Sequence, residues 1–239
     1  MKPILFNTEM VRAILDGRKN VTRRVANIST EIHCGCSTDD HDFVPDNFNH
    51  PEEKPTGFVC RKCGFGVAPP YSRVPCGTSL FRPRYWPGDI LYVRETWTEL
   101  CYVDPDGYTH YDQTTYYYAA DGAPDITLVD ADGFELDDQR IKWKPSIHMP
   151  KEAARIFLRV TDVRVERLQN IDAAGIRAEG VGTMAAFAGD MEIASAEFRN
   201  LWDSTIKPAD LPFCGWEANP LVWVYKFERI SKEEVSGDA

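Results

Sequence analysis

A basic turn near the start of the chain holds the residue types best suited to chemistry. Residues 17–24 read Gly-Arg-Lys-Asn-Val-Thr-Arg-Arg, which gathers four cations and one hydroxyl in a chain whose formal net charge is -10. Cations just past a helix C-terminus gain about 0.3–1 kcal/mol from the helix dipole without any function, and Thr22 is then an ordinary strand threonine. The other interpretation is a turn that holds an anion or performs catalysis.

The residues before the turn predict elements that fix its position. Lys2–Phe6 has the pattern of a strand, and Asn7 or Thr8 is placed to cap the helix that follows. Gly17 suits the position that ends this helix. Four apolar residues fall on one helical face: Met10, Val11, Ile14 and Leu15. Packed structure is therefore expected to hold the basic turn in place.

The spacing of the turn resembles a known family signature. Gly-x-Lys-x-x-Thr-x-Arg after an N-terminal strand and helix, here Gly17, Lys19, Thr22 and Arg24, is similar to the signature of the ASCH superfamily of PUA-like domains. The resemblance implies an α+β fold, with a small mixed PUA-like β-barrel and flanking short helices.

Three later segments extend this resemblance in the same order along the chain. Pro87–Trp97, Trp143–Pro150 and Trp216–Pro220 look like phage-encoded members of the superfamily. The likeness covers about residues 1–25, 85–120 and 140–230, and it leaves two insertions outside.

The resemblance implies a catalytic group for amide hydrolysis. Small bacterial N4-acetylcytidine amidohydrolases of this superfamily use the lysine and threonine of the signature with a downstream glutamate. Lys19 and Thr22 match the first two, and Glu179 is the match for the third by its order in the chain and its place at a predicted helix end. Thr22 would attack while a neutral Lys19 takes its proton. A water nucleophile with Glu179 as base is an equal alternative.

Other residues are candidates for binding a substrate. Arg18, Arg23 and Arg24 surround Lys19 in sequence and would lower its pKa. Glu95 can accept from the cytosine amine, and Trp97, expected on the same strand face, can stack on a base. Core packing is the other interpretation of Trp97. Two further candidates lie between prolines, and the histidine is open to a purely structural interpretation: Ser146 and His148.

Two functions follow from these residues. The first is an amidohydrolase that acts on N4-acylcytidine. The second is a non-catalytic PUA-like reader of RNA or of modified DNA bases. The expected partner is a modified nucleoside or single-stranded nucleic acid, since the acidity of the chain disfavours long duplexes. The acidic block 121–139 offers a third possibility, the binding of a host protein. The sequence leaves the oligomeric state open.

Residues 26–86 have the composition of an inserted loop-rich module. Cys-x-Cys and Cys-x-x-Cys pairs, separated by about two dozen residues, supply four thiolates for a structural Zn²⁺ in a tetrahedral, closed site. The predicted ligands are Cys34, Cys36, Cys60 and Cys63. His33, His41 or Cys76 could replace one of them, and ordinary reduced cysteines are the alternative.

Periodicity predicts the remaining elements. Asp89–Trp97, Ile156–Leu168 and Leu221–Phe227 read as strands, and Tyr108–Ala119 adds a hairpin. A change of phase near Thr161 predicts a bulge. Helices are expected over Asp172–Ala178 and Asp190–Ile206, the second with an inner face of Ala194, Phe198 and Leu201.

The segments group into one main domain of residues 1–25 and 87–230. The module 26–86 and the acidic loop 121–139 are insertions, and 231–239 is predicted to be a flexible tail. No apolar run reaches the length of a membrane span, and no signal peptide pattern opens the chain. We therefore expect a cytoplasmic protein of a bacterial host cell, encoded by a phage or prophage, that has no membrane partner.

Overall fold

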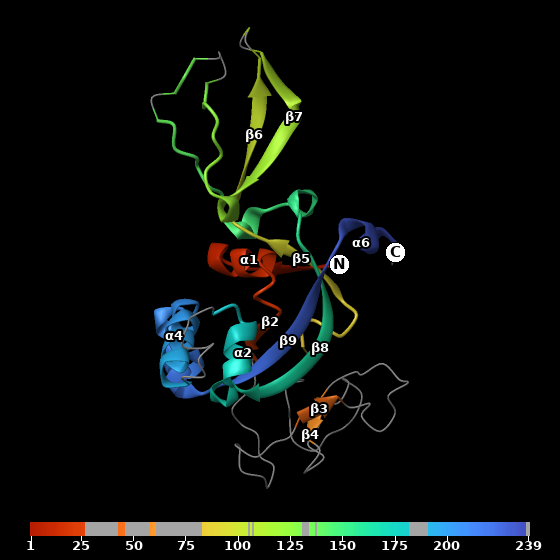
Figure 1. The fold of residues 1–239 in the computed structure, drawn as a ribbon, viewed down its shortest axis with the longest axis vertical. Helices are drawn as coiled ribbons and strands as arrows, with labels where there is room; N and C mark the ends of the chain where they lie inside the picture. The colour runs from red at the N-terminus through yellow and green to blue at the C-terminus, as the bar shows by residue number, and fades with distance from the viewer. Residues whose placement is uncertain are drawn as a thin grey trace. The chain divides into compact units, whose positions relative to one another are not determined.

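The chain forms two compact units in the computed structural model (Figure 1). The structure describes residues 1–26, 43–45, 58–60, 83–104, 106, 108–130, 134–136, 138–181 and 191–237. Unit 1 comprises residues 1–17, 90–159 and 229–239, and unit 2 comprises residues 18–89 and 160–228. The predicted main domain contributes to both units.

The principal sheet has five strands in the order β1-β5-β8-β9-β2. Strand β1 pairs with β5 in parallel, whereas β5 pairs with β8, and β2 with β9, in antiparallel fashion. Strands β8 and β9 run through both units. The bounds are Lys2–Leu5 for β1, Val21–Val25 for β2, Ile90–Arg94 for β5, Phe157–Arg167 for β8 and Leu221–Ile230 for β9.

The predicted α+β class is confirmed, but the described strands form no closed barrel. The sheet order ends at β1 and β2, which do not pair with each other. The hairpin predicted over Tyr108–Ala119 is instead a single strand, β7 (Thr109–Tyr118), which pairs with the preceding strand β6 (Trp97–Val103). These two strands form a sheet of their own instead of extending the five-stranded one, so among the described residues nothing joins the two edges. A third described sheet pairs β3 (Phe43–Pro45) with β4 (Phe58–Cys60).

The predicted helix start and stop in unit 1 are confirmed. Helix α1 spans Thr8–Leu15, and the Asn7 side chain accepts a hydrogen bond from the Met10 N–H at 2.9 Å. Gly17 follows with φ of +74°, a left-handed conformation that favours glycine. The basic turn therefore begins at a defined point of the backbone.

One strand predicted for unit 1 needs correction. The strand expected over Asp89–Trp97 is divided between two strands. Strand β5 ends at Arg94, and β6 begins at Trp97. The tail predicted to be flexible contains helix α6 (Lys232–Gly237). A capping box explains this helix, since Ser231 N–H donates to the Glu234 carboxylate and Ser231 Oγ accepts from Glu234 N–H.

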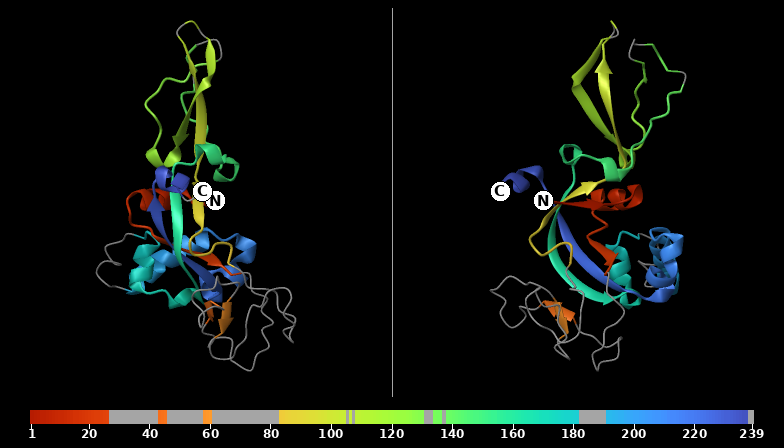
Figure 2. Two further views of the ribbon diagram at one scale, coloured as in Figure 1. Left: turned by 90° about the vertical axis from the view of Figure 1, so that its right-hand side faces the viewer. Right: turned by 180° about the vertical axis from the view of Figure 1, so that it is seen from behind.

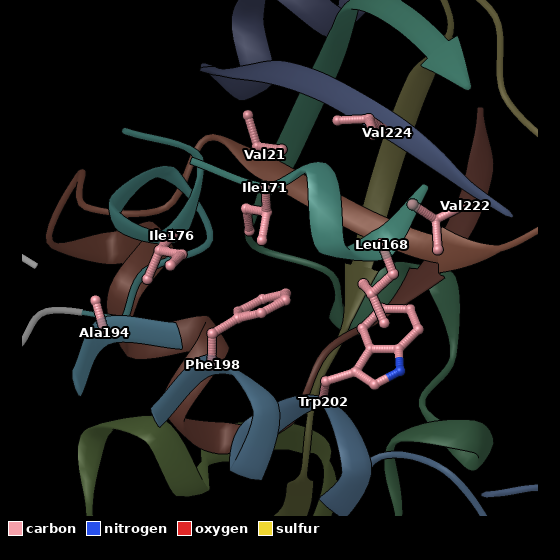
Figure 3. Close-up of a cluster of buried hydrophobic side chains, with 9 residues drawn as sticks. All are labelled: Val21, Leu168, Ile171, Ile176, Ala194, Phe198, Trp202, Val222 and Val224. Atoms are coloured by element: carbon pink, nitrogen blue, oxygen red, sulfur yellow. The ribbon is translucent and has the colours of Figure 1, made fainter. Parts of the chain in front are cut away.

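Unit 2 is built around an apolar cluster between the sheet and two helices, drawn in Figure 3. Helices α2 (Ala173–Ala178) and α4 (Met191–Ser204) supply one side of it, and β2 and β9 supply the other. The predicted inner face of α4 is corrected at one position, since Trp202 is buried in place of Leu201. The cluster comprises Val21, Leu168, Ile171, Ile176, Ala194, Phe198, Trp202, Val222 and Val224.

The change of phase predicted in β8 is visible in its burial. Val160 and Val163 are buried, while the two residues between them, Thr161 and Asp162, are both exposed. Shorter helices are η1 (Ala119–Asp121), η2 (Ser146–His148), η3 (Lys151–Ala153), η4 (Leu168–Asn170), η5 (Pro208–Asp210), α5 (Leu211–Cys214) and η6 (Trp216–Ala218). None of the described helices is both long and apolar enough to cross a bilayer.

Candidate functional site

The signature lysine and the predicted glutamate meet in unit 2. Lys19 lies just before β2, and Glu179 caps the C-terminus of α2. The two backbones form an antiparallel bridge, extended by a hydrogen bond of 3.0 Å from Asn20 N–H to the Ala178 carbonyl. Lys19 Nζ lies 2.6 Å from Glu179 Oε2, and the Lys19 side chain is fully buried. Residues 160 positions apart are thus brought into direct contact.

Lys19 Nζ makes three hydrogen bonds. It donates to the Glu179 carboxylate, to the Glu179 carbonyl at 2.9 Å and to the Val21 carbonyl at 2.8 Å. An ammonium has three N–H donors and no lone pair, so this set of acceptors fits the charged form of Lys19. Burial lowers the pKa of Lys19 below its ordinary value, and the charge and hydrogen bond of Glu179 oppose that change.

Arg23 extends the ion pair into a chain of four charges. Its NH1 lies 3.2 Å from Glu179 Oε1, and its NH2 lies 2.7 Å from Glu166 Oε1 on β8. The side chain of Arg23 is buried. Lys19 and Arg23 balance Glu179 and Glu166, which is the condition under which buried charges are tolerated.

Sequence reasoning missed Glu166, although its position held a signal. Arg164 and Glu166 alternate with apolar residues on β8, and Arg164 Nε donates to Glu166 Oε2 at 3.1 Å. Gly175 also matters here, because a Cβ at that position would lie 3.1 Å from Arg23 NH2 and 2.9 Å from an Ile171 side-chain carbon. Glycine lets α2 approach the strand closely enough for Glu179 to reach both cations.

The side chains of Thr22 and Arg24 project from β2 on the face opposite to that of Arg23. Side chains alternate along a strand, and the β2–β9 register sets Thr22 against Tyr225 and Arg24 against Trp223. Thr22 is buried. Lys19 therefore contacts Glu179 and Val21, whereas the hydroxyl of Thr22 belongs to the other side of the strand.

That second face carries an aromatic and cationic group that the sequence did not single out. The ring of Tyr85 meets that of Tyr225 edge-on at 5.1 Å, and the Arg84 guanidinium lies 5.6 Å from the Tyr85 centroid. Tyr225 Oη accepts a hydrogen bond from Arg84 N–H, and burial raises the pKa of Tyr225 to about 12. Burial lowers the pKa of Arg24, and the charge of Glu179, followed by those of Tyr85 and Tyr225, opposes that change.

Arg18 has a simpler place. Its side chain is exposed and NH1 donates to the Gly180 carbonyl at 3.0 Å. This contact joins the basic turn to the residue after Glu179.

Glu95 belongs to unit 1 and has both oxygens occupied. It is buried, and Arg155 donates to Oε1 at 3.0 Å and to Oε2 at 3.1 Å. Burial raises the pKa of Glu95, and the Arg155 hydrogen bonds oppose the rise. Because Arg155 also pairs with Asp121, the first residue of the acidic block is held at η1. The predicted acceptor for a cytosine amine thus already binds a guanidinium.

Trp97 is a core residue of unit 1. It is buried against Met149 and Phe157, the Lys144 ammonium lies 4.9 Å from its ring centroid, and the Tyr116 ring lies 5.8 Å away. The prediction that Trp97 and Glu95 share one face of a strand is wrong, because Glu95 lies between β5 and β6 and belongs to neither strand. The core-packing interpretation holds in this structure.

Ser146 and His148 lie at the two ends of η2, also in unit 1. His148 is exposed, and Ser146 is half-buried. Of the predicted site residues, Lys19 and Arg23 share the carboxylate of Glu179, whose charge also acts on Arg24.

The predicted zinc ligands fall largely outside the described residues. Cys34, Cys36 and Cys63 lie there, as do the possible substitutes His33, His41 and Cys76. Cys60 is described only as a backbone position of β4, paired with Phe43. Within the described parts of the chain, no three His, Cys, Asp or Glu side chains gather to hold a metal ion.

Comparisons with protein-family models, with curated proteins and with solved structures give no match to this chain. The ASCH resemblance thus rests on the residues themselves.

Proposed function

We propose that this protein is a non-catalytic, ASCH-type PUA-like reader that binds a modified pyrimidine nucleoside or a single-stranded nucleic acid through unit 2. The contact between Lys19 and Glu179 supports the resemblance, since the superfamily signature led to that pairing. The observation that carries the choice of a reader is the set of three acceptors around Lys19 Nζ.

A general base needs a lone pair, and the Lys19 ammonium has none. Glu179 is also engaged, with one oxygen on Lys19 and the other on Arg23. The charge chain then serves to fix β2 against α2. Binding falls to the opposite face, where the guanidinium groups of Arg24 and of the exposed Arg84 lie beside the buried rings of Tyr85 and Tyr225. Arginine and aromatic side chains are the groups that stack on bases and pair with their edges.

Hydrolysis of N4-acylcytidine is the second candidate function, and the short Lys19–Glu179 distance favours it. A proton that moves from Nζ to Oε2 across 2.6 Å would leave a neutral amine and a neutral acid. The amine could then take the proton of Thr22 as its oxygen attacks the acyl carbon, and Glu179 could return its proton to the leaving cytosine amine; water would then hydrolyse the ester left on Thr22. This route requires Lys19 Nζ to turn from the Val21 carbonyl toward the Thr22 side of the strand.

One assay of the full chain separates the two functions. Purified protein is incubated with N4-acetylcytidine, its deoxy form and longer-acyl analogues, and the products are separated by chromatography. The reader predicts that no cytidine forms. Cytidine release that disappears in both Lys19→Met and Thr22→Val would establish the amidohydrolase instead.

Binding is measured in parallel by fluorescence anisotropy with single-stranded RNA and DNA oligonucleotides that carry cytidine or N4-acetylcytidine. Arg24→Gln should weaken binding about 10- to 100-fold, the value of a charge-assisted hydrogen bond. Arg199→Gln is the matched control, because it removes the same charge from a half-exposed position of unit 2. Equal affinities of the two variants and the wild type would refute the proposed face.

A further inference from the structure

The β6–β7 hairpin and the loop after it carry the whole net negative charge of the chain. Residues 97–139, here called the acidic arm, contain 11 Asp or Glu and no Lys or Arg. The full chain has 37 acidic and 27 basic residues, which leaves 26 acidic against 27 basic outside the arm. The arm lies within unit 1, and Figure 2 shows the hairpin and the loop running beside each other.

The outer half of the hairpin also exposes aromatic rings. Tyr102, Tyr108 and Tyr111 are 50%, 68% and 78% exposed. Large rings that stay in water on a small sheet are a common mark of an interaction surface. Solubility alone does not require exposed aromatic rings at these positions.

Two of these tyrosines lie against one histidine ring, which in turn contacts a carboxylate. Tyr102 lies opposite His110 in the strand register, and the His110 ring is 5.6 Å from that of Tyr102 and 5.1 Å from that of Tyr108. His110 Nε2 lies 3.0 Å from Asp104 Oδ2. We call Tyr102, Asp104, Tyr108 and His110 the tip face.

The inner half of the arm, Trp97–Glu99 and Tyr118–Asp121, contacts two cations of the same chain. The two cations, which lie outside the arm in sequence, each contact one aromatic ring and one carboxylate of the arm, and Arg155 also pairs with Glu95 before it. These are Lys144, 4.9 Å from the Trp97 centroid and paired with Glu99, and Arg155, 3.9 Å from the Tyr118 centroid and paired with Asp121. Ring and carboxylate together favour a cation through its charge and its flat or methylene surface.

We propose that the tip face docks a Lys- or Arg-rich segment of a partner protein. It offers the same combination of rings and carboxylates as the inner half of the arm, with Asp106 and Asp112 nearby and exposed. An arm that has carboxylates and no Lys or Arg repels phosphates. A purely apolar partner would bury these carboxylates without a compensating charge, which costs free energy. Charge complementarity therefore selects a basic segment. This docking role is separate from the ligand face of unit 2.

The test uses the full chain and a fluorescein-labelled peptide of nine arginines, with anisotropy measured in 150 mM salt. The variant Tyr102→Ser/Tyr108→Ser keeps every charge and should weaken binding about 5- to 30-fold, from about 0.5–1 kcal/mol for each exposed cation–π contact. Phe213→Ser is the matched control, because Phe213 is 77% exposed in unit 2. It should leave the affinity unchanged. A nine-lysine peptide should bind more weakly than nine arginines, since guanidinium stacks on rings.

A second variant protects the test from misfolding. Asp106→Asn/Asp112→Asn keeps the rings and leaves intact the turn in which Asp104 accepts from the Tyr108 backbone. It should weaken binding and flatten its salt dependence. Wild-type affinity in the folded tyrosine variant, or in this aspartate variant, would overturn the proposal. So would loss of self-association or of single-stranded DNA binding on mutation of the tip face, because either would assign it to another occupant.

Discussion

Lys19→Met tests directly whether the buried charges of unit 2 act as one network. The substitution replaces a fully buried ammonium with an apolar side chain of similar length and leaves Glu179 with Arg23 alone. Removing one partner of a buried pair costs about 3–5 kcal/mol. Because Arg23 remains 3.2 Å from Glu179, we expect the lower end, about 3 kcal/mol.

The double variant Lys19→Met/Glu179→Leu sharpens this prediction. It deletes one cation and one carboxylate, and the remaining Arg23 and Glu166 still balance at 2.7 Å. Its cost should therefore fall below the sum of the two single costs by at least about 1.5 kcal/mol, within the range of coupling between groups in one network.

The assay is urea unfolding at neutral pH, followed by tryptophan fluorescence. Glu217→Gln is the control, since Glu217 pairs with Arg199 at 2.8 Å but is 72% exposed. It should change the unfolding free energy by less than about 0.5 kcal/mol. A Lys19→Met cost as small as that of the control, or additive single costs, would refute the network.

Three further outcomes are expected. Tyr225 has a pKa raised to about 12 from 10.0, so the tyrosine ionises at lower pH in the unfolded chain than in the folded one. The free energy of unfolding should therefore fall by about 2–3 kcal/mol as the pH rises between these values. Urea unfolding of Tyr225→Phe at several alkaline pH values should lack this loss. Asn219 has a left-handed φ of 44° and accepts from Gln169 N–H, so Asn219→Ala should cost about 1–2 kcal/mol in urea unfolding and Asn219→Gly less. Elemental analysis should find about one zinc ion per chain and clearly less in Cys60→Ser; metal-free, fully folded protein would contradict the zinc prediction.

Local patterns of the sequence predicted the elements whose partners lie close by. Asn7 and Gly17 mark the ends of α1, and Asp172 caps α2 through Gly175 N–H, because each signal acts within one helical turn. The hairpin expected within Tyr108–Ala119 was not predicted correctly, because that segment is one strand whose partner β6 precedes it. Barrel closure was not predictable either, since it depends on which distant strands pair, and an apolar alternation looks the same in an open sheet as in a closed one.

Burial of charged groups shows the same limit. Glu95 follows an apolar strand and looks like a pocket residue, yet its environment is set by Arg155, 60 positions later. Glu179 was found only because a family signature suggested where to look. No family signature pointed to Glu166, and its alternation with Arg164 is also the pattern of a solvent-exposed strand.

The charge chain also decides how any loss of function in unit 2 must be interpreted. Lys19 and Glu179 hold β2 to α2, so a variant of either can lose binding or turnover because the strand has moved. Thr22→Val differs, since it removes a single hydroxyl from a buried position, keeps the shape of the side chain and leaves all four charges paired. A folded Thr22→Val that loses turnover while Lys19→Met is still folded would point to chemistry at the strand. If only Lys19→Met loses function, the cause is a displaced β2. A reader predicts this result for binding: affinity falls in Lys19→Met and is kept in Thr22→Val.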